Sequence, residues 1–118
     1  MTGASEASPL DKFHWKKRVL VVVAPAGDPG AEMQRRIYEA SAKGMSERSI
    51  VLTEAVDDSE RSRQIRSRLS AEGSRFQVFL VGKDGHTADS STKPLSAEDV
   101  FARVDAMPMR QDEMRRGR

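Results

Sequence analysis

Residues 19–24 read VLVVVA and residues 25–30 read PAGDPG, and this stretch decides the fold. An apolar run without polar alternation is typical of a strand buried on both faces, as in a parallel or mixed sheet covered by helices. The prolines and glycines that follow predict a turn. Asp28 is a favoured N-cap and Pro29 suits the first helical position, so we expect a helix from here to about Lys43.

The spacing of Met33, Ile37 and Ala40 predicts one apolar face on this helix. Gly44 is placed to end the helix in a left-handed cap. Upstream of the strand, residues 10–17 predict a short extended or turn segment that packs Phe13 and Trp15 at the edge of the core.

Further elements follow in regular order along the chain. Ser96 and Asp99 have the spacing of a capping box and predict a last helix, which Pro108 should end or kink near Met107. The other expected elements are a strand at 49–56, a helix at 61–71 closed by Gly73, a strand at 76–81, a hairpin turn at 82–85 and a short polar edge strand at 86–90.

This order of elements predicts an α/β architecture. A strand–helix–strand unit makes a right-handed parallel crossover, whereas the final hairpin pairs its strands antiparallel. The expected result is a mixed four-stranded sheet with helices on both faces. That arrangement is the core of the thioredoxin-like fold.

The length of 118 residues suits one domain. Residues 1–9 are small and polar and predict a disordered N-terminal tail. We therefore expect a thioredoxin-like domain over residues 10–110, followed by a charged C-terminal tail over 111–118 that frays.

Composition excludes several classes of function. The chain has no cysteine, which removes a disulfide framework, a thiolate nucleophile, an iron–sulfur site and a cysteine-based zinc site. Its two histidines, His14 and His86, lack metal-ligand spacing, so we expect no metal and no cofactor. Lys plus Arg number 20 and Asp plus Glu 18, a near balance that does not describe a strongly basic nucleic-acid binder.

The sequence also bears on location and partners. The longest apolar run, residues 19–24, is too short for a membrane span or a signal peptide. We expect no membrane association and a cytoplasmic protein, or a periplasmic or secreted one if a leader was removed. The arginines between Arg61 and Arg75 have no aromatic among them to stack bases, so nucleic acid is not favoured over a protein or peptide partner. The oligomeric state is not indicated.

Four segments together resemble a bacterial family of unknown function with a thioredoxin-like domain. They are FHWKKRVL at 13–20, Ala24-Pro25, LVGKDG at 80–85 and VDAMPMR at 104–110. Relatives of that domain are similar to modules in vertebrate extracellular-matrix and sushi-repeat proteins. The resemblance implies the fold over roughly residues 10–115 and implies no established activity.

The stretch 24–30 is also similar to the thioredoxin active-site sequence, in which Ala-Pro precedes Trp-Cys-Gly-Pro-Cys. In this resemblance Ala26 takes the tryptophan place, Pro29 matches the proline, and Gly27 and Gly30 take the two cysteine places. The helix start that activates a thiolate persists, but the sulfur is absent. Where thioredoxins carry a cis-proline, this chain reads Gly73-Ser74-Arg75. We expect no thiol–disulfide oxidoreductase activity.

These observations predict a redox-inactive binding or interaction module. Its candidate ligand-binding residues are Pro25, Gly27, Asp28, Gly30, Ser74 and Arg75, and its ligand would be an extended peptide, a partner loop or a small anion. The alternative is an enzyme with non-cysteine chemistry in the same cleft, with Asp28 as acid or base and Arg75 binding charge; no catalytic residues are predicted otherwise.

The turn at 82–85 is expected at the opposite end of the sheet as a structural hairpin. Met107 and Met109 form either a soft binding lip or, for Met107, core filling.

Overall fold

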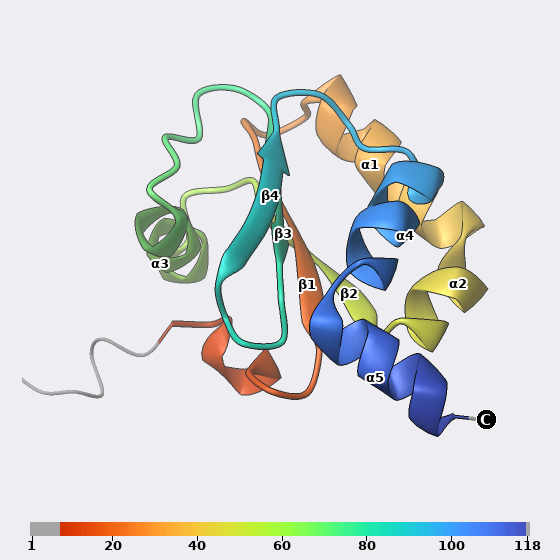
Figure 1. Cartoon of the computed structure of the whole chain (residues 1–118). Helices are drawn as coiled ribbons and strands as arrows, with labels where there is room; N and C mark the ends of the chain where they lie inside the picture. Colours follow the sequence, from red (N-terminus) through yellow and green to blue (C-terminus); the bar gives the residue numbers. More distant parts are fainter. Residues whose placement is uncertain (1–7, 118) are drawn as a thin grey trace, which may run out of the picture.

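A computed structural model describes residues 8–117 (Figure 1). The strands are β1 (Arg18–Val23), β2 (Ile50–Ala55), β3 (Gln77–Val81) and β4 (Thr87–Ser91). The helices are α1 (Pro29–Ala40), α2 (Ala42–Glu47), α3 (Glu60–Leu69), α4 (Ala97–Asp105) and α5 (Pro108–Arg116), with a 3₁₀ turn at Asp11–Phe13. The predicted strands are confirmed with bounds that differ by a residue or two.

The four strands form one mixed sheet in the order β2-β1-β3-β4. β1 runs parallel to β2, with Arg18 opposite Ile50, and antiparallel to β3, with Val23 opposite Gln77. β3 and β4 pair antiparallel as a hairpin. This is the sheet that the order of elements predicts.

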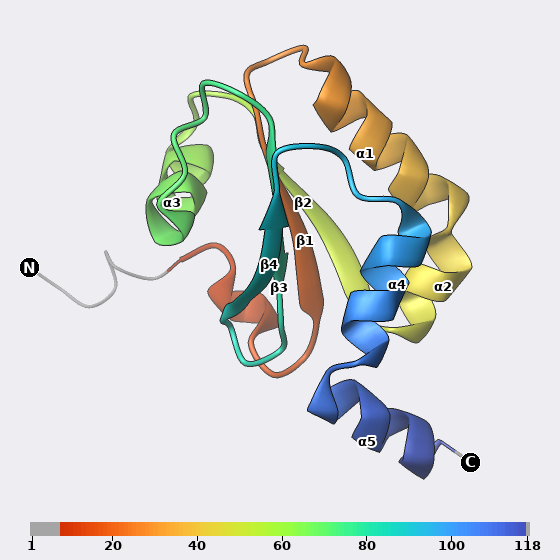
Figure 2. The same ribbon diagram turned by 45° about the horizontal axis from the view of Figure 1, so that its top comes forward.

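Both faces of β1 are buried, as its unbroken apolar run requires. Leu20 and Val22 join a core under α1, α2 and α4, which lie on one side of the sheet. Val19, Val21 and Val23 face the other side, where α3 and the 3₁₀ turn cover them (Figure 2).

Helix α1 begins as predicted but buries a different face. The Asp28 carboxylate caps it and Pro29 takes its first position. The predicted apolar face is wrong, because Met33 is 51% exposed whereas Gln34 is fully buried. Gln34 is buried because its amide donates to the carbonyl of Leu95 and accepts from the Leu95 backbone N–H.

The predicted left-handed cap at Gly44 is also wrong. Helix α1 already ends at Ala40, and Gly44 lies inside helix α2. A Cβ at Gly44 would stand 2.6 Å from Cζ of Phe101. Gly44 therefore gives room to an aromatic ring instead of ending a helix. Helix α3 likewise ends at Leu69, before Gly73 is reached, and its C-cap is Ser70, whose φ is +57°.

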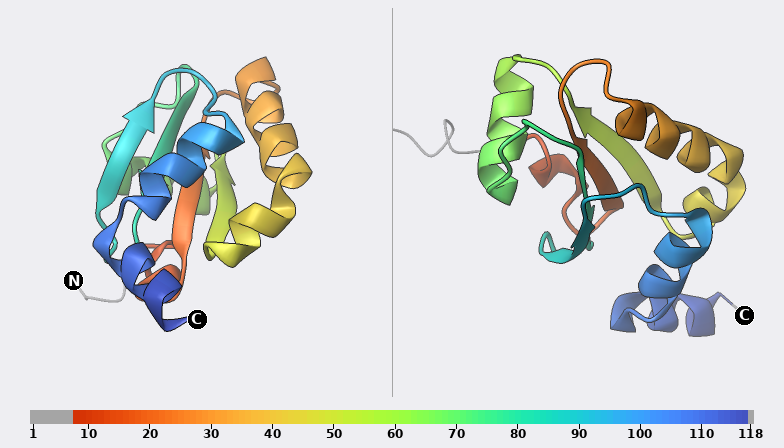
Figure 3. Two further views of the ribbon diagram at one scale, coloured as in Figure 1. Left: turned by 45° about the vertical axis from the view of Figure 1, so that its right-hand side comes forward. Right: turned by 90° about the horizontal axis from the view of Figure 1, so that it is seen from above.

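The C-terminal segment differs from the expected fraying tail. Ser96 caps α4 as predicted, accepting from the Asp99 N–H. Pro108 then starts a new helix, α5, at the lower end of the sheet, and this helix continues to Arg116 (Figure 3). Within the described chain the segment is thus helical well past residue 110. The tail predicted at residues 1–9 lies mostly outside the described residues.

The two N-terminal aromatic residues, Phe13 and Trp15, differ in burial. Phe13 packs partly buried against the α3 side of the core, but Trp15 is 60% exposed, so its predicted packing is wrong. Trp15 has a φ of +68° and its backbone N–H donates to the Lys83 carbonyl at 2.6 Å. Across residues 8–117, we find no helix with the length and apolar character needed to span a bilayer.

Candidate functional site

The Pro25–Gly30 loop joins the carboxyl end of β1 to the amino end of α1. Because β3 pairs antiparallel with β1, the segment before Gln77 lies at this same end of the sheet. Ser74 and Arg75 belong to that segment, and both are exposed. The structure therefore brings the predicted loop and the predicted pair to one end of the sheet.

Gly27 and Gly30, the two positions that match cysteines in the thioredoxin resemblance, have different surroundings. A Cβ at Gly30 would lie 2.9 Å from both Cδ1 of Phe76 and Oδ2 of Asp28. A Cβ at Gly27 would meet nothing within 4 Å, but the φ of Gly27 is +76°, which strains any other residue. Neither position accepts a side chain without a change in the backbone or in Phe76.

Asp28 occupies the helix amides that an anion would need. Its Oδ2 atom accepts from the N–H of Gly30 at 2.8 Å and from the N–H of Ala31 at 3.2 Å. A bound anion would have to displace this carboxylate. A general acid or base role for Asp28 likewise gains no support, since the same oxygen is held as the helix cap.

Two cavities of about 240 and 470 Å³ flank the loop and share Pro25 and Val56. Gly27 and Asp28 line the smaller cavity and Ala26 the larger one. Neither cavity is lined by Ser74 or Arg75. The charged residues that line them are Asp28, Glu32, Arg35, Asp57, Asp58, Arg66 and Glu72, five carboxylates against two arginines.

The two arginines of this lining already have acceptors. Arg35 makes a two-point contact with Glu54, at 2.7 and 2.8 Å, and Arg66 donates to the carbonyl of Asp57. Hydrogen bonds from Ser59 and Ser62 lower the pKa of Asp57 to about 2, so this carboxylate is ionised at neutral pH. The lining of these two cavities therefore carries more negative than positive charge.

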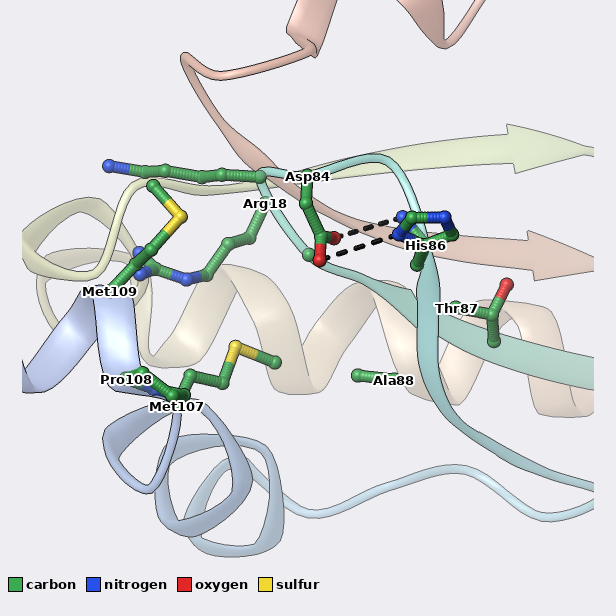
Figure 4. Close-up of a pocket in the computed structure, with 10 residues that line it drawn as sticks. Arg18, Asp84, His86, Thr87, Ala88, Met107, Pro108 and Met109 are labelled. Atoms are coloured by element: carbon green, nitrogen blue, oxygen red, sulfur yellow. Dashed lines mark hydrogen bonds and ion pairs between the residues drawn. The ribbon is translucent and has the colours of Figure 1, made fainter.

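Sequence reasoning offered Met107 and Met109 as a soft binding lip but did not connect them with Arg18 or Lys83 at the opposite end of the sheet. There a cavity of about 360 Å³ lies between the β3–β4 turn and the elbow where α4 meets α5 (Figure 4). Arg18, Lys83, Met107 and Met109 are among its lining residues. The available signal was a charged residue, Arg18, directly before the apolar run 19–24, and in the structure Arg18 is only 1% exposed. The 82–85 turn thus closes the β3–β4 hairpin, as predicted, and it also lines this cavity.

A network of charges holds this region together. Glu113 accepts from Nη1 and Nη2 of Arg18, at 3.3 and 3.1 Å, and from Nζ of Lys83 at 2.7 Å. Burial raises the pKa of the Glu113 carboxyl, but hydrogen bonds from Lys83 and Arg18 outweigh burial and leave the pKa below its ordinary value. Glu113 is therefore an ionised anchor for helix α5.

A second carboxylate continues the network. Asp105 accepts from Nε and Nη2 of Arg48, both at 3.0 Å, and from Nε of Arg110 at 3.1 Å. The Arg48 hydrogen bond, aided by Arg110, lowers the pKa of Asp105. The Arg48 guanidinium also stacks over the Phe101 ring at 4.0 Å, which fixes α2 against α4.

Solved structures with the same arrangement define the class of fold. A reduced 2-Cys peroxiredoxin from Plasmodium vivax superposes with a TM-score of 0.61 at 13% identity, covering 87% of this chain and 72% of the peroxiredoxin. The mitochondrial 2-Cys peroxiredoxin of Plasmodium falciparum gives 0.55 at 12% identity, with 82% and 79% covered. The fold is thioredoxin-like, and this chain carries it without a cysteine.

The family follows from the sequence. Residues 9–113 match the family described as Domain of unknown function (DUF4174), and the chain belongs to it. It is similar to the Sushi repeat-containing protein SRPX2 of Xenopus laevis, with 25% identity over 111 residues, 81% of this chain and 24% of that protein. Human SRPX2 is 26% identical over 127 positions, 93% and 27% of the two chains. This chain thus spans about a quarter of the length of these curated relatives.

Proposed function

We propose that this domain is a redox-inactive binding module that holds an extended, positively charged segment of a protein partner. The site is the Pro25–Gly30 loop together with Ser74 and Arg75. The main support for this proposal is the charge of the two cavities beside the loop, whose lining contains five carboxylates and two arginines. Since opposite charges steer association, a basic partner is favoured over a small anion.

The backbone of the Ser74–Arg75 segment supports an extended ligand. Among the described residues, neither Ser74 nor Arg75 makes a backbone–backbone hydrogen bond outside the regular elements, and the β1–β3 ladder stops at Gln77. Exposed backbone groups at the end of a strand pair readily with another extended chain. The partner's main chain would bond here while its basic side chains meet Asp57 and Asp58.

A peptide titration tests this proposal. The probe is acetyl-Lys-Val-Lys-Val-amide, added to the nitrogen-15-labelled protein, with the glutamate version of the peptide as the charge-reversed control. We expect amide shifts at residues 26–28 and 74–75 with the lysine peptide only. Shifts that map elsewhere, or equal binding of both peptides, would contradict the proposal.

A pair of matched variants sharpens the assignment of the site. Ala26→Trp places a bulky ring on the loop surface, and we expect it to abolish those shifts. Ala102→Trp adds the same ring at an exposed position of α4 and should leave binding unchanged. If Ala26→Trp binds the lysine peptide as the parent protein does, the loop is not the site.

A further inference from the structure

The cavity at the elbow between α4 and α5 is lined by two cations, Arg18 and Lys83, and by one carboxylate, Asp84. These two cations belong to a network of four cations and two carboxylates, whose other members lie beside the cavity and do not line it. The exposed fractions of the cation side chains are 1% for Arg18, 13% for Lys83, 14% for Arg110 and 17% for Arg48. Only Glu113 and Asp105 balance them. Burying a charge without its full counter-charge is costly, so this environment favours an additional anion.

The carboxylate that lines the cavity is engaged elsewhere. Asp84 accepts from the His86 backbone N–H at 3.0 Å, and its Oδ2 lies 3.5 Å from Nδ1 of His86. Figure 4 shows Asp84 and His86 on one side of the cavity, with Arg18, Met107 and Met109 gathered on the other. Even when Asp84 is counted, the cations outnumber the carboxylates by one.

Hydrogen-bond donors remain available on the cationic side. Lys83 has three N–H donors, and Glu113 is its acceptor in the described chain. Arg18 donates from Nη1 and Nη2 to Glu113 and to the Arg48 carbonyl, which leaves its Nε without an acceptor among the described residues. The Glu113 side chain demonstrates that a carboxylate fits the chemistry of these two cations.

The cavity also has apolar lining residues, and Figure 4 places Met107 and Met109 on the same side as Arg18. Met107, Pro108, Met109 and Ala88 line it, and Met109 is 39% exposed. Methionine side chains are flexible and polarizable, so they adapt to apolar ligands of varied shape. The volume of about 360 Å³ is at the small end of the range for ligand pockets.

We propose that this cavity is a second binding site, separate from the loop site, for a small amphipathic carboxylate. The ligand's carboxylate binds Arg18 and Lys83, and its short apolar part lies against Met107 and Met109. Such a group is supplied by a free medium-chain acid or by the C-terminus of a peptide.

The cavity is assembled from segments that lie far apart in the sequence. The segments 13–20, 80–85 and 104–110, which carry the family resemblance, supply Arg18, Lys83 and Met107 to this one cavity. The remaining segment, Ala24-Pro25, lies at the loop end of the sheet. Three separate parts of the chain thus meet at a cavity that combines charge and apolar surface.

The test uses the full chain with carbon-13 methyl-labelled methionine, titrated with octanoate and with its neutral analogue octanamide. We expect octanoate to shift the methyl signals of Met107 and Met109 while those of Met33 and Met45 stay in place. Octanamide should bind at least about tenfold more weakly, since it lacks the charge that the cations recognise. Equal binding of the two compounds, or no shift of Met107, would overturn the proposal.

Variants distinguish the site from a merely structural ion pair. Because Arg18→Met removes a buried group and is at risk of not folding, the informative change is Lys83→Met, which should weaken octanoate binding about tenfold. Lys93→Met alters an exposed lysine in the β4–α4 connection and should change nothing. Unchanged octanoate binding in Lys83→Met would refute the site.

A peptide arm identifies the source of the carboxylate. Acetyl-Leu-Leu with a free C-terminus is compared with its C-terminal amide. Tighter binding of the free acid peptide than of octanoate assigns the site to peptide C-termini. Binding of octanoate alone assigns it to free acids.

Discussion

The ring of Phe76 packs directly against the Cα of Gly30, so that a Cβ at position 30 would lie 2.9 Å from Cδ1 of the ring. Gly30 takes the place of the second cysteine in the thioredoxin resemblance. In this protein the position is closed by an aromatic side chain as well as lacking sulfur. At this position the loop makes a packing contact with Phe76.

Gly30→Ala is expected to destabilise the domain by about 1–3 kcal/mol, because the added methyl meets Phe76 and the Asp28 carboxylate. Urea unfolding followed by circular dichroism measures the change. In the background of Phe76→Leu, the same substitution should cost less, since the smaller side chain can move away. A Gly30→Ala protein as stable as its parent would show that the ring yields freely.

Gly44→Ala should also destabilise the domain, although helix propensity alone would predict that it stabilises helix α2. Alanine in a helix interior is favoured over glycine by about 1 kcal/mol. Here, however, the new Cβ would stand 2.6 Å from Cζ of Phe101, whose ring is held under Arg48. Thermal unfolding should show a lower midpoint for Gly44→Ala and recovery in the Gly44→Ala, Phe101→Leu double variant. A raised midpoint in the single variant would be the opposite of this expectation.

Glu113→Gln should cost about 1–3 kcal/mol of unfolding free energy, because it leaves the buried Arg18 without its carboxylate partner. Asp112→Asn is the matched control. It removes a neighbouring carboxylate of α5 that pairs only with the exposed Arg115 and Arg116 in the described chain, and should change stability by about 0.5 kcal/mol or less. Similar losses in both variants would mean that the contact with Arg18 contributes little.

Stability should fall with acid in a defined window. The pKa values of Asp57, Asp105 and Glu113 are lowered in the folded protein, so folding favours their ionised forms. Their contribution is complete above the ordinary pKa values of 3.8 for Asp and 4.5 for Glu, and is lost as the pH falls through the folded values. For Asp57 that loss extends to a pKa of about 2.

Urea unfolding across this acid range tests the linkage. Asp57→Asn should flatten the decline of unfolding free energy between about pH 4 and pH 2, because the shifted carboxyl is gone. Asp58→Asn is the control, since the Asp58 side chain accepts no hydrogen bond from the described residues. An unchanged slope in Asp57→Asn would rule out its part in acid unfolding.

Local signals in the sequence were sufficient for the sheet and for the helix starts. The apolar run of β1 marks a strand buried on both faces, and the caps Asp28 and Ser96 lie where each helix begins. The buried face of α1 was not predictable in this way. Gln34 is turned inward by hydrogen bonds to Leu95, 61 positions away, and no spacing within the helix reports that contact.

The candidate sites, too, were predictable only in the part that depends on the order of the elements. The loop and the Ser74–Arg75 segment follow from strand order, so their shared location was predictable. The charge of the loop surface was not, because Asp57, Asp58 and Glu72 reach it from other segments. The elbow cavity depends on a contact between Arg18 and Glu113, which are 95 positions apart. Only the folded chain brings these two residues together.

Helix α5 buries none of its described residues, and its ionic contacts with Arg18, Lys83 and Asp105 therefore carry much of its attachment. Salt weakens ion pairs that solvent reaches and leaves apolar packing intact, and in these pairs the carboxylates of Glu113 and Asp105 are 30% and 34% exposed. Added salt should loosen this end of the molecule while the sheet stays folded. Backbone amides of α5 should then exchange with deuterium well before those of β1. In salt, helix α5 would thus separate from a domain whose sheet remains folded.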